Sequence, residues 1–223
     1  MKHEITIFHL LTMTSGLQVR SFQGTKNWVK SILEQPLLHK PGSTFQYNSS
    51  NSHLLSAIIK QVSGTSTAAF AEKHIFDPLG IKKYTWVSDP QGIHGGGFSM
   101  SMSLEDMRKI GMLLLYNGNY LSKQLISANW IAQSKSPFKH VEAGSHGAYG
   151  YGYQLWTFES SDSDNPIDFY FASGLFGQYI FIVPKLEVVA AVKSQLPHDQ
   201  QDLPRQFFEE FLHCLKNSEY KNT

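Results

Sequence analysis

The chain has 223 residues, of which 41% are hydrophobic and 13% aromatic, so it can bury a sizeable core and disorder is excluded as its main state. Nineteen Lys and Arg residues against eighteen Asp and Glu leave a formal net charge of +1, which gives no strong field toward nucleic acid or an anionic membrane. The single cysteine, Cys214, excludes an internal disulfide and a multi-cysteine zinc site.

The sequence contains no targeting or membrane signal. No apolar run approaches the roughly 20 residues that span a bilayer, and the start of the chain leads into Ile5-Thr6-Ile7-Phe8 without a signal-peptide pattern. As written, the chain is expected to be cytoplasmic. No linker or repeat divides it, which predicts one domain over residues 1–223.

Helical patterns dominate the first two-thirds of the chain. Residues 51–64 place Leu54, Leu55, Ile58, Ile59 and Val62 on one helical face, with Ser and Asn caps before the helix and Gly64 after it. A second helix is expected from Ser66 to Phe76, stopped by Pro78 and Gly80. A third begins after the capping-box sequence Ser103-Leu104-Glu105-Asp106 and ends at Asn117-Gly118.

From Tyr149 onward, aromatic and β-branched runs separated by turn residues predict consecutive antiparallel strands. The expected strands are residues 151–158, 167–172, 179–183 and 188–192. A final amphipathic segment, with Phe207, Phe208, Phe211, Leu212 and Leu215 on one side, predicts a C-terminal helix over the sheet. The fold class is therefore α+β, with helices first and a sheet last.

Several chemical motifs are weak. The ten histidines show no metal-ligand spacing, and His140 and His146 are interpreted as loop residues. The segment Gly95-Gly96-Gly97 is interpreted as a packed turn, because no Lys-Ser/Thr follows it. The sequence Ser136-Pro137-Phe138-Lys139 matches Ser-x-x-Lys formally but lies in a polar loop.

A more informative feature is Tyr47-Asn48-Ser49, which directly precedes the first strongly predicted helix. The partial positive charge at a helix N-terminus favours phenolate over phenol, so Tyr47 could serve as a general base. An ordinary half-buried loop tyrosine is the alternative interpretation.

With these residues in order, the sequence resembles the penicillin-binding protein and serine β-lactamase superfamily, especially its esterase, D-aminopeptidase and 6-aminohexanoate-dimer hydrolase branches. The string Leu10-Leu11-Thr12-Met13-Thr14-Ser15-Gly16-Leu17 resembles the stretch after that family's nucleophile helix. Tyr47-Asn48-Ser49 is similar to its Tyr-x-Asn motif. Ala172-Ser173-Gly174 is similar to its His-x-Gly or Lys-Thr-Gly strand motif. The resemblance implies an antiparallel sheet with flanking helices, of the β-lactamase/DD-peptidase type.

The resemblance also implies roles for individual residues. A serine of Ser-x-x-Lys would attack a carbonyl to form an acyl-enzyme, with Tyr47 as general base and acid and with no metal or cofactor. Ser49, Ser173 and Gly174 would bind substrate, and the backbone N–H of Leu175 would be one oxyanion donor. Ala172 stands where a His or Lys often sits, which favours a neutral ester or small amide.

The Ser-x-x-Lys motif belongs upstream of Ile5, so the chain as given is expected to be the C-terminal portion of the family domain, inactive without its nucleophile. An unpaired sheet edge and an exposed apolar face would then promote self-association. The alternative function is a non-catalytic binding module that keeps the cleft and binds a peptide or acyl-amide ligand. A metal hydrolase is a third alternative.

Overall fold

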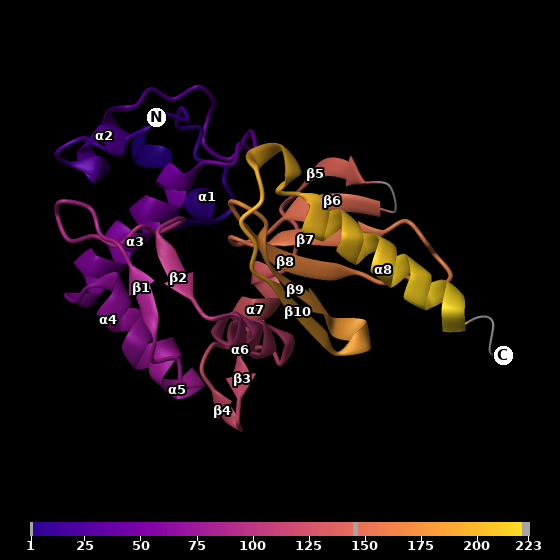
Figure 1. Cartoon of the computed structure of the whole chain (residues 1–223). Helices are drawn as coiled ribbons and strands as arrows, with labels where there is room; N and C mark the ends of the chain where they lie inside the picture. Colours follow the sequence, from indigo (N-terminus) through magenta and orange to yellow (C-terminus); the bar gives the residue numbers. More distant parts are fainter. Residues whose placement is uncertain (1, 145–146, 220–223) are drawn as a thin grey trace. The chain divides into compact units, whose positions relative to one another are not determined.

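The computed structural model describes residues 2–144 and 147–219, and the chain divides into two compact units (Figure 1). Unit 1 comprises residues 1–103, 120–125 and 152–154, and unit 2 comprises residues 104–119, 126–151 and 155–223. The single domain expected over residues 1–223 stays a prediction, since a domain can contain more than one compact unit.

Unit 1 consists mainly of helices and carries a small sheet. Its elements are the 3-10 helix η1 (Lys2–Glu4), α1 (Ile7–Leu11), α2 (Trp28–Glu34), α3 (Ser49–Ser63), α4 (Thr67–Ala71), the π-helix η2 (Glu72–Phe76), α5 (Asp77–Leu79), and the antiparallel strands β1 (Tyr84–Trp86) and β2 (Met100–Met102). Its apolar core is formed by Leu10, Leu17, Phe22, Ile32 and Leu54.

Helix α3 confirms the first predicted helix and begins two residues earlier, because Asn48 caps it. The Asn48 side chain accepts a hydrogen bond from the Ser50 N–H at 3.0 Å, and Gly64 ends the helix in the left-handed conformation, with φ of 69°. The predicted apolar face is wrong at Val62, which is 82% exposed. The buried residues of the first turns of α3 are instead largely polar.

The second predicted helix extends beyond its expected end. Residues 67–79 stay helical through α4, η2 and α5, and Pro78 follows directly after the π-helix η2, as the second residue of α5. Gly80, with φ of 66°, ends the helical stretch as expected.

The glycine run at residues 95–97 is a packed turn, as predicted. A Cβ atom on Gly96 would lie 1.8 Å from the Ser52 carbonyl oxygen and 2.8 Å from the His53 nitrogen. Both atoms belong to the backbone of α3, which cannot move aside cheaply. A glycine at this position therefore lets residues 95–97 lie directly against the helix.

We expect Gly96→Ala to lower the free energy of unfolding by about 1–3 kcal/mol, as measured by urea denaturation, because the added methyl group overlaps helix backbone. Gly97→Ala is the matched control. Its Cβ would meet the Ser52 side chain at 3.1–3.3 Å, which can adjust, so the loss should be smaller. Equal losses in the two variants would contradict this packing argument.

Unit 2 is built on a six-stranded antiparallel sheet in the order β10-β9-β8-β7-β6-β5. Its strands are β5 (Lys139–Gly144), β6 (Gly147–Tyr151), β7 (Trp156–Ser160), β8 (Phe169–Gly174), β9 (Gln178–Val183) and β10 (Val188–Val192). Its helices are α6 (Leu104–Leu115), α7 (Ala128–Ser134), α8 (Leu203–Glu219) and the short 3-10 turns η3 (Pro184–Leu186) and η4 (His198–Gln200). Strands β3 (Asn119–Tyr120) and β4 (Lys123–Gln124) form a separate hairpin, of which residues 120–125 belong to unit 1.

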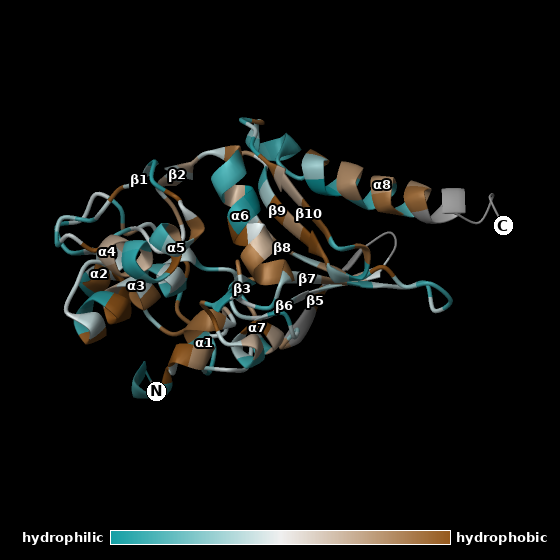
Figure 2. Cartoon of the chain, turned by 90° about the horizontal axis from the view of Figure 1, so that it is seen from below, coloured by the Kyte–Doolittle hydropathy of each residue, from teal (hydrophilic) through white to brown (hydrophobic). Residues whose placement is uncertain are grey.

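Helices α6 and α8 pack on opposite faces of this sheet, because alternate residues of each strand face opposite ways. Tyr170 and Ile182 pack with α6, whereas Phe169 and Phe181 pack with Phe208 of α8. Apolar and polar residues alternate around α8, as Figure 2 shows by colour. The C-terminal helix over the sheet is therefore confirmed.

The apolar face predicted for α8 needs one correction. Phe208 and Leu212 are buried, but Phe207, Phe211 and Leu215, which follow one another at intervals of four residues, are 74%, 45% and 38% exposed. The helix is also held by polar contacts, since the Tyr149 hydroxyl donates to the Glu209 carboxylate and the Arg205 guanidinium lies 4.6 Å from the centre of the Tyr149 ring.

The strand expected over residues 151–158 is wrong. The chain forms two strands there, β6 and β7, separated by a turn at residues 152–154. Gln154 adopts a positive φ of 58°, which is incompatible with a continuous strand. The three later strands are confirmed, with β8 displaced two residues toward the C-terminus at both ends.

No helix in residues 2–144 and 147–219 is both long and apolar enough to cross a membrane.

Candidate active site

In unit 1, the Tyr47-Asn48-Ser49 sequence forms a rigid turn at the start of α3. Asn48 is 2% exposed, and besides capping the helix its Nδ2 donates to the Leu17 carbonyl oxygen at 3.1 Å. Tyr47 is 44% exposed, and Ser49 is the first residue of the helix. The buried asparagine thus fixes the backbone of a turn that presents a tyrosine to solvent.

A layer of buried polar contacts holds the first turns of α3 against residues 10–17. The Ser15 hydroxyl donates to Asn51 Oδ1 at 2.7 Å, and the Ser52 hydroxyl donates to Gln154 Oε1 at 2.6 Å. Gln154 Nε2 in turn donates to the carbonyl oxygens of Leu10 and Leu11 at 3.2 and 3.1 Å. Asn48, Asn51 and Ser52 follow helical spacing, so this periodicity of polar residues was a signal that the sequence interpretation missed.

The pKa of the Tyr47 phenol is raised from its ordinary value, because surrounding protein removes part of its solvent. Desolvation acts against the phenolate that the helix N-terminus is expected to favour. Tyr47 is a neutral phenol at neutral pH. Proton abstraction by Tyr47 would require a nearby cation that stabilises the phenolate.

In unit 2, the other candidate residues lie at the end of β8 and in the turn that follows. Ser173 and Gly174 are the last residues of β8, and in the hairpin they are paired with Tyr179 and Gln178 of β9. Leu175 begins the turn and is 59% exposed. Within the described part of the chain, its backbone N–H donates no hydrogen bond. An oxyanion donor requires an N–H group that makes no hydrogen bond within the protein.

The candidate residues therefore form two groups. Tyr47 and Ser49 are brought together in unit 1, and Ser173, Gly174 and Leu175 are brought together in unit 2. The roles of the five residues stay predictions.

A family model named Beta-lactamase matches residues 1–214, almost the whole chain. The chain belongs to the Beta-lactamase family. This confirms the resemblance drawn from the sequence motifs, and it makes the chain a member of a hydrolase family that includes esterase and amidase branches. The sequence has no significant match among curated proteins.

Solved structures confirm the fold expected of a Beta-lactamase family member. The "Putative 6-aminohexanoate-dimer hydrolase from Bacillus anthracis" has a TM-score of 0.76 and 20% identity, covering 96% of this chain and 62% of that one. An octameric penicillin-binding protein homologue from Pyrococcus abyssi has a TM-score of 0.68 and 21% identity, covering 87% and 52%. EstCE1, a hydrolase with promiscuous acyltransferase activity, has a TM-score of 0.69 and 18% identity, covering 90% and 70%.

The chain thus spans only 62% and 52% of the lengths of the first two of these structures.

This Beta-lactamase family chain has two features to compare with the expected unpaired sheet edge and exposed apolar face. Strand β10 has one neighbour, β9, among the described residues. In unit 1, an apolar groove of about 810 Å³ opens along helices α1 to α3, and its apolar lining includes Ile5, Leu10, Val29, Leu33, Leu54 and Ile58.

The structure also places the weaker motifs. Ser136 follows α7 and donates to the Ala132 carbonyl oxygen, and Lys139 begins β5, so this serine and lysine do not share a helix turn. His140 lies in β5 rather than in a loop, which corrects the prediction, and His146 lies outside the described residues. Among the described residues, no group of three His, Cys, Asp or Glu side chains could hold a metal ion.

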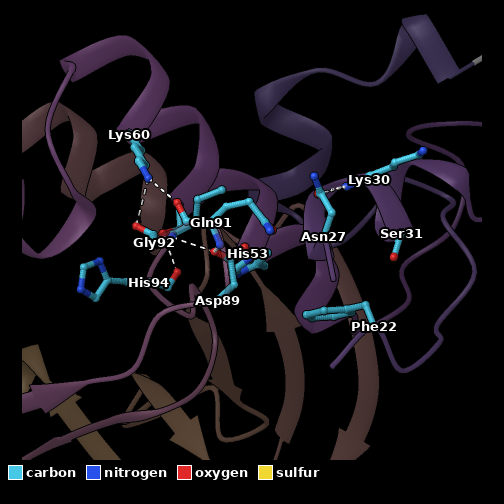
Figure 3. Close-up of polar contacts among 12 residues, drawn as sticks. Phe22, Asn27, Lys30, Ser31, His53, Lys60, Asp89, Gln91, Gly92 and His94 are labelled. Atoms are coloured by element: carbon cyan, nitrogen blue, oxygen red, sulfur yellow. Dashed lines mark hydrogen bonds and ion pairs between the residues drawn. The ribbon is translucent and has the colours of Figure 1, made fainter. Parts of the chain in front are cut away.

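Unit 1 also contains a buried histidine–aspartate pair, between α3 and the loop at residues 89–93, which was not predicted (Figure 3). His53 Nε2 lies 3.2 Å from Asp89 Oδ2, and both side chains have no solvent exposure. Asp89 Oδ1 accepts hydrogen bonds from the N–H groups of Gln91 and Ile93, each at 2.8 Å. The imidazole is surrounded by aromatic rings, at centroid distances of 5.3–6.1 Å, from Phe22, Trp28 and Phe98.

Burial lowers the pKa of His53, and the hydrogen bond and charge of Asp89 oppose this effect without reversing it. The imidazole is therefore neutral in the folded chain at neutral pH. Its Nε2–H donates to Asp89, and Nδ1 has no partner within the described residues. The pair fixes the loop at residues 89–93 against α3.

We expect the His53 ring signal to titrate below pH 6.5 in an NMR titration, with His53→Gln identifying the signal. Because the unfolded chain binds this proton more readily, His53 should make the fold less stable as the pH falls below about 6.5. A His53 signal that titrates above pH 6.5 would contradict the assignment of a neutral, desolvated ring.

Proposed function

We propose that this chain carries the acid–base residue and one oxyanion donor of a serine hydrolase that cleaves an ester or small amide through an acyl-enzyme. The serine oxygen attacks the substrate carbonyl carbon while Tyr47 takes the serine proton, and Tyr47 then returns that proton to the leaving alcohol or amine. Water then attacks the acyl carbon while Tyr47 takes a proton from it. Tyr47 returns that proton to the serine oxygen, which leaves, and the carboxylic acid is released.

The other four candidate residues act on the substrate. The Leu175 N–H and the nucleophile's own N–H stabilise the tetrahedral oxyanion, and Ser49, Ser173 and Gly174 contact the bound substrate. Ala172 supplies neither charge nor hydrogen bond at the position of the family's frequent His or Lys. A neutral acyl group is therefore favoured over one with a carboxylate.

The observation that carries this proposal is the Tyr47 turn. Asn48 is buried and makes hydrogen bonds to both Ser50 and Leu17, so the chain holds one exposed tyrosine at a helix N-terminus in a fixed position. A hydroxyl held in this way is placed for proton transfer to a bound substrate.

We also propose that the nucleophile and its lysine lie on a polypeptide segment outside residues 1–223. The open edge of β10, the apolar groove of unit 1 and the greater length of the first matching structures support this. The lysine would provide the cation that lowers the Tyr47 pKa and allows proton abstraction.

A non-catalytic binding module is the second candidate function. The raised pKa of Tyr47 favours it, because a neutral phenol can donate a hydrogen bond to a ligand but cannot act as a base. The ligand would then be a peptide or acyl amide.

Covalent labelling separates the two functions. We define the extended polypeptide as one in which a segment containing Ser-x-x-Lys precedes residues 1–223; DNA upstream of codon 1, translated in frame, would supply its sequence. Intact-mass analysis after treatment with a fluorophosphonate should show one label on that serine of the extended polypeptide and none on residues 1–223. An unlabelled extended polypeptide, or label on residues 1–223, would contradict the hydrolase proposal.

The open edge of β10 should also cause self-association of residues 1–223, because unpaired backbone groups can pair with a second copy. Sedimentation velocity over a hundredfold concentration range should show a rising weight-average mass. A single monomeric species at all concentrations would contradict this.

A further inference from the structure

Residues 194–196 form hydrogen bonds to the turn between β8 and β9. Ser194 Oγ lies 2.7 Å from the carbonyl oxygens of both Phe176 and Gly177 and can donate to either. The Leu196 N–H donates to the Phe176 carbonyl oxygen at 3.1 Å, and the Gln178 side chain donates to the Ser194 carbonyl oxygen. The backbone of Phe176 is therefore fixed in position.

Two successive residues of this turn have left-handed backbones, but only one of them is glycine. Phe176 has φ of 66° and Gly177 has φ of 80°. Glycine is required at 177, where a Cβ atom would lie 2.5 Å from Ser194 Oγ. A bulky aromatic residue at positive φ is a conformational outlier, so glycine or asparagine would suit the turn at 176 better.

Burial does not compensate for this unfavourable conformation. Phe176 is 51% exposed, and its neighbour Leu175 is 59% exposed. The turn thus holds two large apolar side chains partly in water, directly beside the Leu175 N–H that donates no hydrogen bond within the described residues. Strained backbone conformations cluster at ligand-binding sites, and this one directly follows the candidate oxyanion donor.

The geometry points to Phe176 as a specificity-determining residue that contacts an apolar acyl chain, with the adjacent Leu175 N–H binding the carbonyl oxygen of the same group. This inference rests on the proposed function and names its substrate class: neutral esters or amides with an apolar acyl chain. An acyl group whose carbonyl oxygen binds the Leu175 N–H would extend beside the next residue of the turn. Each additional methylene that contacts the ring should then strengthen binding.

The test is an NMR titration of residues 1–223 with neutral amides of increasing chain length, from acetamide to hexanamide. The amide signals of Leu175, Phe176 and Gly177 should shift, and affinity should rise about fourfold for each added methylene that the ring buries. Phe176→Gly and Phe176→Asn both tolerate the left-handed backbone, and both should abolish the dependence on chain length.

Phe207→Ala is the matched control, because Phe207 is an exposed phenylalanine on α8, and it should keep the dependence. Unchanged dependence in Phe176→Asn, or shifts confined to residues outside the turn, would overturn the inference. The amide titration and the acylation experiment test different claims. If the extended polypeptide is not acylated, the hydrolase proposal is contradicted. The amide titration measures contact with Phe176 and involves no chemical step.

Discussion

Asp89→Ala should lower the free energy of unfolding by about 3–5 kcal/mol, because it removes the acceptor of three hydrogen bonds, and a donor left without its partner costs about 1–3 kcal/mol when buried. The substitution leaves the N–H groups of Gln91 and Ile93 and the ring of His53 without their acceptor. The side chains of His53 and Asp89 have no solvent exposure, so the lost contact to the ring is not replaced by bulk water. Urea denaturation followed by circular dichroism measures the loss.

Two controls test that explanation. Asp77→Ala removes an exposed aspartate whose partner is Lys82, and a surface pair of this kind contributes at most about 1 kcal/mol. Asp89→Asn keeps one oxygen acceptor and should lose less stability than Asp89→Ala. Comparable losses in Asp77→Ala and Asp89→Ala would show that the buried pair does not stabilise unit 1.

Tyr47→Phe should reduce acylation of the extended polypeptide by a factor of about one hundred or more, because the substitution removes the hydroxyl that transfers the serine proton. The ring stays, so the turn capped by Asn48 should keep its structure. Stopped-flow acylation by a nitrophenyl ester measures the rate, and the melting temperature of the variant checks that folding is unaffected.

Tyr116→Phe is the control for loss of a tyrosine hydroxyl. Tyr116 is a partly exposed residue beyond the end of α6 and outside the candidate site. Loss of the Tyr116 hydroxyl should leave the acylation rate of the extended polypeptide unchanged. An equal rate in Tyr47→Phe and the wild-type sequence would eliminate Tyr47 as the acid–base residue.

Local features of this fold could be predicted from the sequence because their signals lie within a few residues. Helix α3 has its cap at Asn48 and its stop at Gly64, and the strands β9 and β10 have continuous β-branched and aromatic composition. The motif order around Tyr47 and Gly174 was enough to identify the family, which the family model over residues 1–214 confirms.

The supporting contacts could not be predicted because their partners are distant in sequence. His53 and Asp89 are 36 residues apart, and Ser52 and Gln154 are 102 residues apart. Neither pair has a local pattern, and the positive φ of Gln154 that breaks the expected strand accompanies its bonds to Leu10 and Leu11. The raised pKa of Tyr47 likewise depends on desolvation by the folded chain, which sequence position does not reveal.

The most direct test of the central claim is a crystal structure of the acyl-enzyme trapped on the extended polypeptide. The account predicts that the acyl carbonyl oxygen lies 2.7–3.1 Å from the Leu175 nitrogen and that the Tyr47 hydroxyl lies within hydrogen-bond reach of the serine oxygen. An acyl carbonyl bound by other donors, or a Tyr47 hydroxyl remote from the serine, would contradict it.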